Sequence, residues 1–281
     1  MSIRAKVVAD SICGKRLRLV TVQVRTPTFI DAEIEKHRML SSNSSSSRAV
    51  PFKSIVNSDF YLPEDVRLDK AGMQGDKKLS QQGLAKFQAD LVDIRDYTIT
   101  KIDRQWSYLH KQTINRYLSP FAYQDKIMTG TLDQFDAFFK LRLHPAAQPE
   151  IHLLAKLMKQ AIGQSTPTER ALDEWHLPYI FESERLSSRD AICASVARCA
   201  RVSYLNHDQS VPDVNKDLDL HDKLLTLNHM SCFEHQALPM GKIKGSKLED
   251  IKDQGTSHMD TAGNLWSANF RGWIQYRKLI A

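Results

Sequence analysis

Long apolar runs are absent: no stretch of the 281 residues approaches the twenty that a membrane-spanning helix needs, and the first residues contain no apolar signal segment. We therefore expect a cytoplasmic protein without a membrane anchor. Cysteine is scarce, and the four cysteines are scattered without a Cys-x-x-Cys pair, so we expect reduced core thiols and no metal site. No repeat recurs at a fixed period, and no basic stripe interleaved with aromatic residues indicates a nucleic-acid-binding surface.

The composition is that of an ordinary globular protein. Hydrophobic residues make up 42% and charged residues 26% of the chain, and a chain of this length can bury an adequate core. The formal net charge of +6 favours anionic partners, which we expect to be small phosphorylated molecules. We expect one domain over residues 1–281, with strands, a helix and a Ser-rich loop in 1–51, a helical pair in 80–162 and an α+β half in 189–281.

The first fifty residues carry a strand pattern followed by a helix. Residues 3–10 and 16–25 are β-rich, partly alternating runs, and the short connection between them is typical of an antiparallel hairpin. A helix should follow and carry the Lys-His-Arg triplet of residues 36–38, with Thr26 or Thr28 as its N-cap.

Apolar residues at helical spacing predict the other main elements. The expected helices span residues 80–118, 132–162, 191–205 and 217–228. The first of them should be a long amphipathic helix with one buried stripe. Residues 52–80 have no sustained period, and we expect a long ordered loop there. Together with the hairpin these helices predict an α+β fold with an antiparallel sheet.

A serine-rich stretch is the strongest candidate for chemistry. Residues 35–51 read Glu-Lys-His-Arg-Met-Leu-Ser-Ser-Asn-Ser-Ser-Ser-Ser-Arg-Ala-Val-Pro. Hydroxyls, backbone N–H groups in a turn and a forked guanidinium offer many hydrogen-bond donors to one small anion, which predicts a phosphate cradle. By composition alone the run is equally typical of a flexible linker.

This stretch resembles a known signature. The triplet at residues 36–38, seven further residues and then Ser46, with Asn43 inside the gap and Arg48 after it, is similar to the Arg-His-Arg-(seven)-Ser signature of the flavin-dependent thymidylate synthases. The resemblance is greatest to the longer branch of that family, which is common in phages.

Other segments also resemble the family. Residues 110–121 read His-Lys-Gln-Thr-Ile-Asn-Arg-Tyr-Leu-Ser-Pro-Phe, and residues 138–151 read Phe-Phe-Lys-Leu-Arg-Leu-His-Pro-Ala-Ala-Gln-Pro-Glu-Ile. Residues 229–235 read His-Met-Ser-Cys-Phe-Glu-His, and residues 269–278 read Asn-Phe-Arg-Gly-Trp-Ile-Gln-Tyr-Arg-Lys. The His-Met-Ser segment follows the signature, whereas it precedes it in shorter members, so the motif order looks permuted.

The resemblance implies an activity and roles for residues. Members of the family assemble as homotetramers with sites shared between subunits, so the resemblance implies that assembly here. The implied reaction is reductive methylation of dUMP to dTMP, with methylenetetrahydrofolate as carbon donor, reduced FAD as hydride donor and NADPH as reductant. Arg142 would polarise the uracil ring. The dUMP contacts implied are Ser46, Ser47, Arg48, Arg116 and Gln112. The cofactor contacts implied are His37, Arg38, Asn43, His235, Asn269 and Arg271.

Plainer interpretations stay open beside these roles. Arg142 could neutralise Glu150 or a helix C-terminus, and Arg116 could be a solvated helix charge. The sequence departs from the family pattern at positions near the flavin, namely Lys36, Ser42, Ser44, Ala137 and Ala146. The alternatives are therefore a pyrimidine-nucleotide C5 hydroxymethylase, in which water quenches the methylene adduct, and a non-catalytic nucleotide-binding or nucleic-acid-binding paralogue.

Overall fold

A run rich in valine and threonine, residues 19–27, forms the centre of the main sheet. The computed structural model describes residues 3–14, 18–48, 50–72, 75–206, 210–241 and 254–280. The sheet has the strand order β3-β4-β2-β1-β5. Its strands are β1 (Arg4–Ile12), β2 (Leu19–Pro27), β3 (Ser41–Ser44), β4 (Tyr123–Thr131) and β5 (Thr168–Glu169). Neighbouring strands are antiparallel except for β1 and β5, which are parallel.

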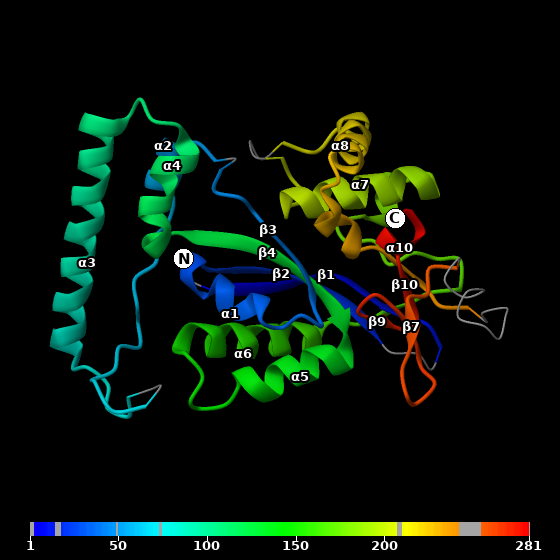
Figure 1. Cartoon of the computed structure of the whole chain (residues 1–281), viewed down its shortest axis with the longest axis horizontal. Coiled ribbons are helices and arrows are strands. Elements are labelled where there is room, and N and C mark those ends of the chain that lie inside the picture. The colour runs from blue at the N-terminus through cyan, green and yellow to red at the C-terminus, as the bar shows by residue number, and fades with distance from the viewer. Residues whose placement is uncertain are drawn as a thin grey trace.

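The helices and the smaller strands surround this sheet (Figure 1). The helices are α1 (Asp31–Glu35), α2 (Phe52–Val56), α3 (Gln81–Lys101), α4 (Lys111–Ile114), α5 (Leu132–Arg142), α6 (Pro149–Gln164), α7 (Ser188–Arg201), α8 (Val214–Thr226) and α10 (Arg277–Ile280). The small strands are β6 (Ala237–Pro239) with β10 (Trp273–Gln275), and β7 (His258–Met259), β8 (Leu265–Ser267) and β9 (Phe270–Arg271). Short 3₁₀ helices lie at Thr28–Ile30, Asn115–Phe121, Glu182–Glu184 and Met230–Glu234, and a π-helical turn lies at Ile102–Trp106.

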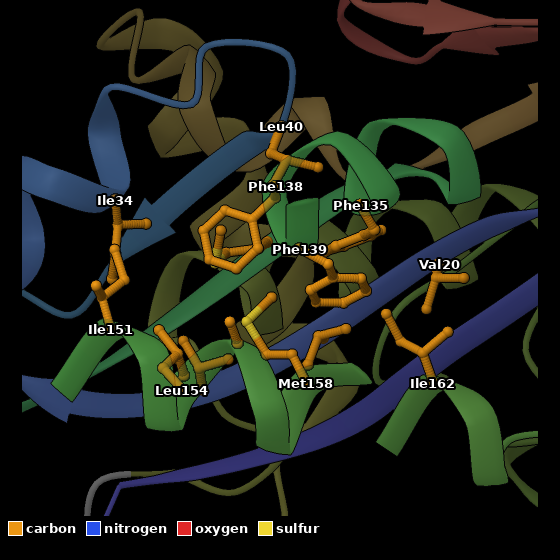
Figure 2. Close-up of a cluster of buried hydrophobic side chains, with 14 of the residues drawn as sticks. Val20, Ile34, Leu40, Phe135, Phe138, Phe139, Ile151, Leu154, Met158 and Ile162 are labelled. Carbon is orange, nitrogen blue, oxygen red and sulfur yellow. The ribbon is translucent and has the colours of Figure 1, made fainter. Parts of the chain in front are cut away.

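Helices cover both faces of the main sheet, which is why the residues of β2 are buried on both sides. On one face α5 and α6 close the larger core, in which Phe138 and Leu154 pack against valines of β2 (Figure 2). On the other face α7 contributes Val196 to a second core around Ile127 of β4. Each face therefore buries apolar surface, which is the dominant favourable term in folding.

The α+β class and the hairpin are confirmed: β1 and β2 pair antiparallel along most of their length. Residues 16 and 17 of the expected second strand lie outside the described residues, as do residues 15, 49, 73 and 74. The four cysteines are buried free thiols, as their spacing predicted. No helix in the described part of the chain is long and apolar enough to cross a membrane.

The predicted helix over residues 80–118 is wrong in extent and in burial. It divides into α3, the π-helical turn and α4, because the side chain of His110 caps a new helix by accepting a hydrogen bond from the backbone N–H of Gln112. The expected buried stripe is also missing within this chain: Arg95 is the buried side chain of α3, whereas Phe87 and Ile94 are 40% and 55% exposed.

Four further features differ from the prediction. The helix over 132–162 breaks into α5 and α6, because a proline is not tolerated inside a helix and Pro149 instead starts α6. The signature triplet follows α1 rather than lying in it, since α1 ends at Glu35. The residue before the first 3₁₀ turn is Pro27, and no side chain caps it; the hydroxyl of Thr28 donates to the carbonyl of Ala122 instead. The loop expected over residues 52–80 begins with the short helix α2.

A glycine lets β3 approach the rest of the sheet. Gly130 of β4 lies beneath Leu40, the residue before β3, and an added Cβ at Gly130 would stand 2.4 Å from a Leu40 methyl and 2.9 Å from Gln134 Oε1. We expect Gly130→Ala to lower the free energy of unfolding by about 1–3 kcal/mol through overpacking, measured by urea denaturation.

Gly163 provides the matched control for this substitution. It lies in α6 with no atom within 4 Å of an added Cβ, so Gly163→Ala should stabilise the protein by about 0.5–1 kcal/mol through helix propensity. Equal effects of the two substitutions would show that the contact between Leu40 and β4 is not tight.

Candidate functional site

The serine-rich stretch is an ordered part of the sheet edge and not a free linker. Ser41–Ser44 form β3, which pairs antiparallel with β4. The next residue continues the pairing: the backbone N–H of Ser45 donates to the carbonyl of Asp125 at 2.8 Å, and its hydroxyl accepts from the N–H of Asp125 at 3.1 Å. The side-chain amide of Asn115 donates to the carbonyl of Ser47 at 2.7 Å. These bonds fix the turn that follows β3.

This turn forms one wall of a cavity of about 770 Å³, which we call the serine cavity. Ser46, Ser47 and Arg48 line it, and so does Arg116, although Arg116 lies almost seventy residues further along the chain. The hydroxyl of Ser46 accepts a hydrogen bond from the backbone N–H of Arg48 at 3.3 Å. The structure thus brings together four of the five predicted dUMP contacts; Gln112 lies on α4 and does not line the cavity within the described residues.

A second cavity, of about 540 Å³, lies on the other side of β3, and we call it the arginine–asparagine cavity. Three of the predicted cofactor contacts line it, namely His37, Arg38 and Asn269. The side-chain amide of Asn269 donates to the carbonyl of Met39 at 2.9 Å, which ties the C-terminal segment to the loop before β3. Basic residues and hydroxyls give this cavity a polar lining that suits an anionic cofactor.

The other three predicted cofactor contacts lie elsewhere. Asn43 of β3 donates its side-chain amide to the carbonyl of Cys199 at 2.9 Å and accepts from the hydroxyl of Ser231 at 2.9 Å, so it joins the sheet to α7. Arg271 forms an ion pair with Asp133 at 2.9 Å. Neither side chain lines the two cavities above within the described residues.

His235 lies in the core, with no exposed surface. Its Nδ1 shares a hydrogen bond of 2.8 Å with the hydroxyl of Thr129, and that hydroxyl lies 2.8 Å from the hydroxyl of Thr21. Nε2 of His176 continues the chain at 2.8 Å from Thr21. Burial lowers the pKa of His235 to about 3, so the ring is neutral. The sequence resemblance implied that this histidine contacts a cofactor, whereas the fold buries its side chain in the core against Thr129 of β4.

Arg142 ends α5 and is held by Glu33, which lies in α1, and by His37, which follows α1. Its Nε donates to Nε2 of His37 at 2.7 Å, and its Nη2 donates to the backbone carbonyl of Glu33 at 3.1 Å. Glu150, the partner considered from the sequence, instead accepts from the hydroxyl of Tyr61. Arg142 lines a third cavity of about 480 Å³ and not the serine cavity. A single chain therefore keeps Arg142 and Arg48 in separate cavities.

The contact with Arg142 determines the charge of His37. Burial and the neighbouring guanidinium lower the pKa of His37 to about 4 from its ordinary value of 6.5. An imidazole whose Nε2 accepts from Arg142 must be neutral with its proton on Nδ1. His37 is thus an uncharged acceptor for Arg142 throughout the physiological range, and the carboxylate of Glu33 pairs with the same guanidinium at 3.4 Å.

A pH titration tests this arrangement. Because the folded pKa of His37 lies below the unfolded one, the unfolded chain binds the extra proton between about pH 4 and 6.5. The contribution of His37 to stability should be complete above pH 6.5 and should be lost as the pH falls towards 4. Site-resolved NMR should show His37 titrating near 4; a midpoint near 6.5 would show that the bond to Arg142 is not formed.

Two residues of the serine cavity escaped the sequence analysis. Arg25 ends the alternating part of β2, and Arg201 is the last residue of α7; both line the cavity. A basic residue at the end of a strand or helix is usually solvated, so nothing in the pattern distinguished them. The fold brings both to the cavity, because α7 packs beside β3 and Asn43 of β3 bonds to the carbonyl of Cys199.

Comparison with known proteins assigns the family. The sequence model of the family described as thymidylate synthase complementing protein matches residues 18–168, just over half of the chain. The chain belongs to this family. The matched residues include both the signature triplet and Arg142, and they end close to β5. No curated protein matches this family member significantly.

Solved structures share its fold. One is a UMP/dUMP methylase, PolB, from Streptomyces cacaoi bound with 5-Br UMP: it is 19% identical, has a TM-score of 0.50, and the similarity covers 57% of this chain and 89% of that chain. The same protein bound with 5-Br dUMP is 16% identical with a TM-score of 0.49 and the same coverage. At these identities the likeness is one of fold.

Proposed function

We propose that this member of the thymidylate synthase complementing protein family is a flavin-dependent thymidylate synthase. It methylates dUMP reductively at C5, with the carbon from methylenetetrahydrofolate and the hydride from reduced FAD, which NADPH regenerates. The observation that carries this proposal is the serine cavity, in which Ser46, Ser47, Arg48 and Arg116 meet although the sequence separates them.

The serine cavity suits the phosphate of a pyrimidine nucleotide. Two hydroxyls, turn N–H groups and two guanidiniums give charge-assisted hydrogen bonds to a phosphate monoester. Its volume of about 770 Å³ lies within the usual range for ligand sites and leaves room beyond one phosphate. The similar solved structure is named a UMP/dUMP methylase, and its substrates carry such a phosphate.

The arginine–asparagine cavity fits part of a flavin cofactor. Arg38, Arg277 and Lys278 supply positive charge, with Arg277 paired to Glu234, which also lines the cavity. The hydroxyls of Ser41 and Ser42 line it along β3 and donate to Asn269 and Glu35. The basic groups would hold the polar edge of the flavin ring, and the flavin would supply the hydride for reduction of the transferred carbon. Four departures from the family pattern, Lys36, Ser44, Ala137 and Ala146, lie outside the lining of this cavity within the described residues; Ser42 belongs to it.

Arg142 is proposed to polarise the pyrimidine ring. Uracil C5 is a weak carbon nucleophile, so charge that develops on the ring carbonyls needs a fixed donor in a site that excludes water. His37 and Glu33 orient the guanidinium, and Nη1 is left without a hydrogen-bond partner among the described residues. This free donor can address a carbonyl of the substrate.

The separation of Arg142 from the serine cavity supports a homotetramer with shared sites. If each site is assembled from different copies, Arg142 of one copy can reach the nucleotide held by Arg48 of another. The exposed apolar side chains of α3, Phe87 and Ile94 among them, offer surface for such contacts. Light scattering on the purified protein should give the mass of a tetramer.

A product assay tests the proposed function. Purified protein with dUMP, methylenetetrahydrofolate, FAD and NADPH should form dTMP, identified by mass spectrometry. Formation of 5-hydroxymethyl-dUMP would replace the proposal with the hydroxymethylase, and purified protein that neither binds flavin nor turns over dUMP would replace it with a non-catalytic binding role.

A further inference from the structure

A row of charged groups crosses the sheet on the floor of the serine cavity. In register, Arg25 of β2 faces Asp125 of β4 on one side and Arg4 of β1 on the other. Asp125 in turn pairs with Ser45 through the backbone. Adjacent strands lie about 4.8 Å apart, so the backbone of Arg25 lies roughly 10 Å from that of Ser45. Arg25 thus stands two strands away from the serine turn, at another part of the cavity lining.

The carboxylate in this row is shared by the two arginines beside it. Arg4 and Arg25 each lie 3.8 Å from Asp125, which is a loose ion pair in both cases. Burial also raises the pKa of Asp125, so its negative charge is disfavoured. Nε of Arg25 is buried without a hydrogen-bond partner among the described residues. A buried donor of this kind is costly unless a ligand or water satisfies it.

Arg201 adds a second cation on the opposite wall. Its Nη2 lies 2.7 Å from Oδ1 of Asp217, whose other oxygen accepts from Nε of Arg198 at 2.9 Å. Asp217 is buried and shared by Arg198 and Arg201, while Arg198 is also paired with Glu184 at 2.7 Å. The two arginines and two carboxylates balance in charge, and Asp217 holds Arg201 in place at the cavity wall. Nε of Arg201 is also buried without a hydrogen-bond partner in the described part of the chain.

The end of α7 is fixed over β2, so Arg201 stays above Arg25. Val202, the residue after α7, has a φ of +55°, which a β-branched residue rarely adopts. Its carbonyl accepts a hydrogen bond from the side-chain amide of Gln23 of β2 at 3.1 Å. Both groups line the serine cavity, and the strained turn places the helix end at its wall.

The charges of the cavity exceed what one phosphate needs. Its described lining contains five arginines, Arg4, Arg25, Arg48, Arg116 and Arg201, and two carboxylates, Asp31 and Asp125. Asp31 is already paired with the buried Lys126 at 2.8 Å. A nucleoside monophosphate at the serine turn carries at most two negative charges, which Arg48 and Arg116 match. At the far end Arg4 and Arg25 share the carboxylate of Asp125.

We propose that Arg25 and Arg201 form a second anion-binding end of the serine cavity, which holds the anionic part of the cofactor while the nucleotide phosphate occupies the serine turn. The inference rests on the proposed function, since it assigns that turn to dUMP. The chemistry recognised is a cluster of anionic oxygens. Two sources supply it: the pyrophosphate of a dinucleotide such as FAD, and the glutamate carboxylates of a folate.

Calorimetry on the full chain separates the two ends. Titrations with dUMP, inorganic pyrophosphate, FAD and a folate monoglutamate are compared for wild type, Arg201→Gln and Arg25→Gln. Each variant should weaken pyrophosphate and one cofactor by about tenfold or more, because charge-assisted hydrogen bonds are lost, and should change dUMP affinity by less than about twofold. Loss for FAD identifies the pyrophosphate, and loss for the folate identifies the carboxylates.

Controls keep the result independent of folding and of the reaction. Arg189→Gln changes an exposed arginine of α7 outside the cavity and should leave all four affinities unaltered. Arg201→Gln removes an ion-pair partner of Asp217, whereas Arg25→Gln leaves the ion pairs of Asp217 with Arg198 and Arg201 in place. Agreement between the two variants therefore excludes an indirect effect through Asp217. Equal losses for dUMP and the cofactors, no loss for any ligand, or no binding of pyrophosphate by wild type would each overturn the inference. A selective loss in a protein that makes no dTMP would reject only the proposed function.

Discussion

Replacing Arg142 by alanine is expected to lower the turnover of dUMP by about 10²–10³-fold, the usual effect of removing one fixed donor to developing charge. His37 and the carbonyl of Glu33 hold the guanidinium before substrate arrives, so no reorganisation is needed during the reaction. Steady-state kinetics with dUMP measure the effect, and light scattering checks that the oligomer is unchanged. Lys140→Ala, an exposed cation on the same helix, is the matched control. Normal turnover in Arg142→Ala would refute the proposed role.

Mixing experiments extend this test to the shared site. Subunits carrying Arg142→Ala and subunits carrying Arg48→Ala are each expected to be inactive alone. If one copy supplies Arg142 to the nucleotide held by another, co-assembled subunits should regain part of the activity, because some sites then contain both arginines. No recovery in co-assembled oligomers would show that both residues act from the same copy.

Replacing Arg48 by alanine should weaken dUMP binding on the order of 100-fold and leave deoxyuridine binding almost unchanged. The reason is geometric: Arg48 stands in the turn after β3, beside Ser46, and offers a forked donor to a phosphate that deoxyuridine lacks. Equilibrium titration with both ligands gives the two ratios. Lys53→Ala removes an exposed cation from α2 nearby and serves as the control. Equal losses for dUMP and deoxyuridine would show that Arg48 does not hold the phosphate.

Local patterns predicted the hairpin and the serine turn because both depend on neighbouring residues. The alternation of β1 and β2 and the donor density after residue 40 are properties of short segments. The break before Pro149 was also readable in principle, since a proline cannot continue a helix. The apolar spacing continues across this proline, and it therefore predicted one helix where the chain forms two.

Long-range placement could not be predicted in the same way. Whether the apolar residues of α3 are buried depends on what packs against them, and in the described part of the chain 40% of the surface of Phe87 stays exposed. The hydrogen bond from Arg142 to His37 joins residues more than a hundred positions apart. His235 is buried against Thr129 of β4, which is also more than a hundred positions away. Arg201 illustrates the same limit, because only the path of α7 brings it to the cavity.

The edge strand β3 makes the length of the serine-rich segment more critical than its composition. Asn43 bonds to α7 and to Ser231 of the 3₁₀ helix Met230–Glu234, whereas Ser42 donates to Glu35 of α1. Successive side chains of a strand point to opposite faces, so losing or gaining one residue would exchange these two sets of partners. Many substitutions within the run preserve this alternation, but no single insertion or deletion does.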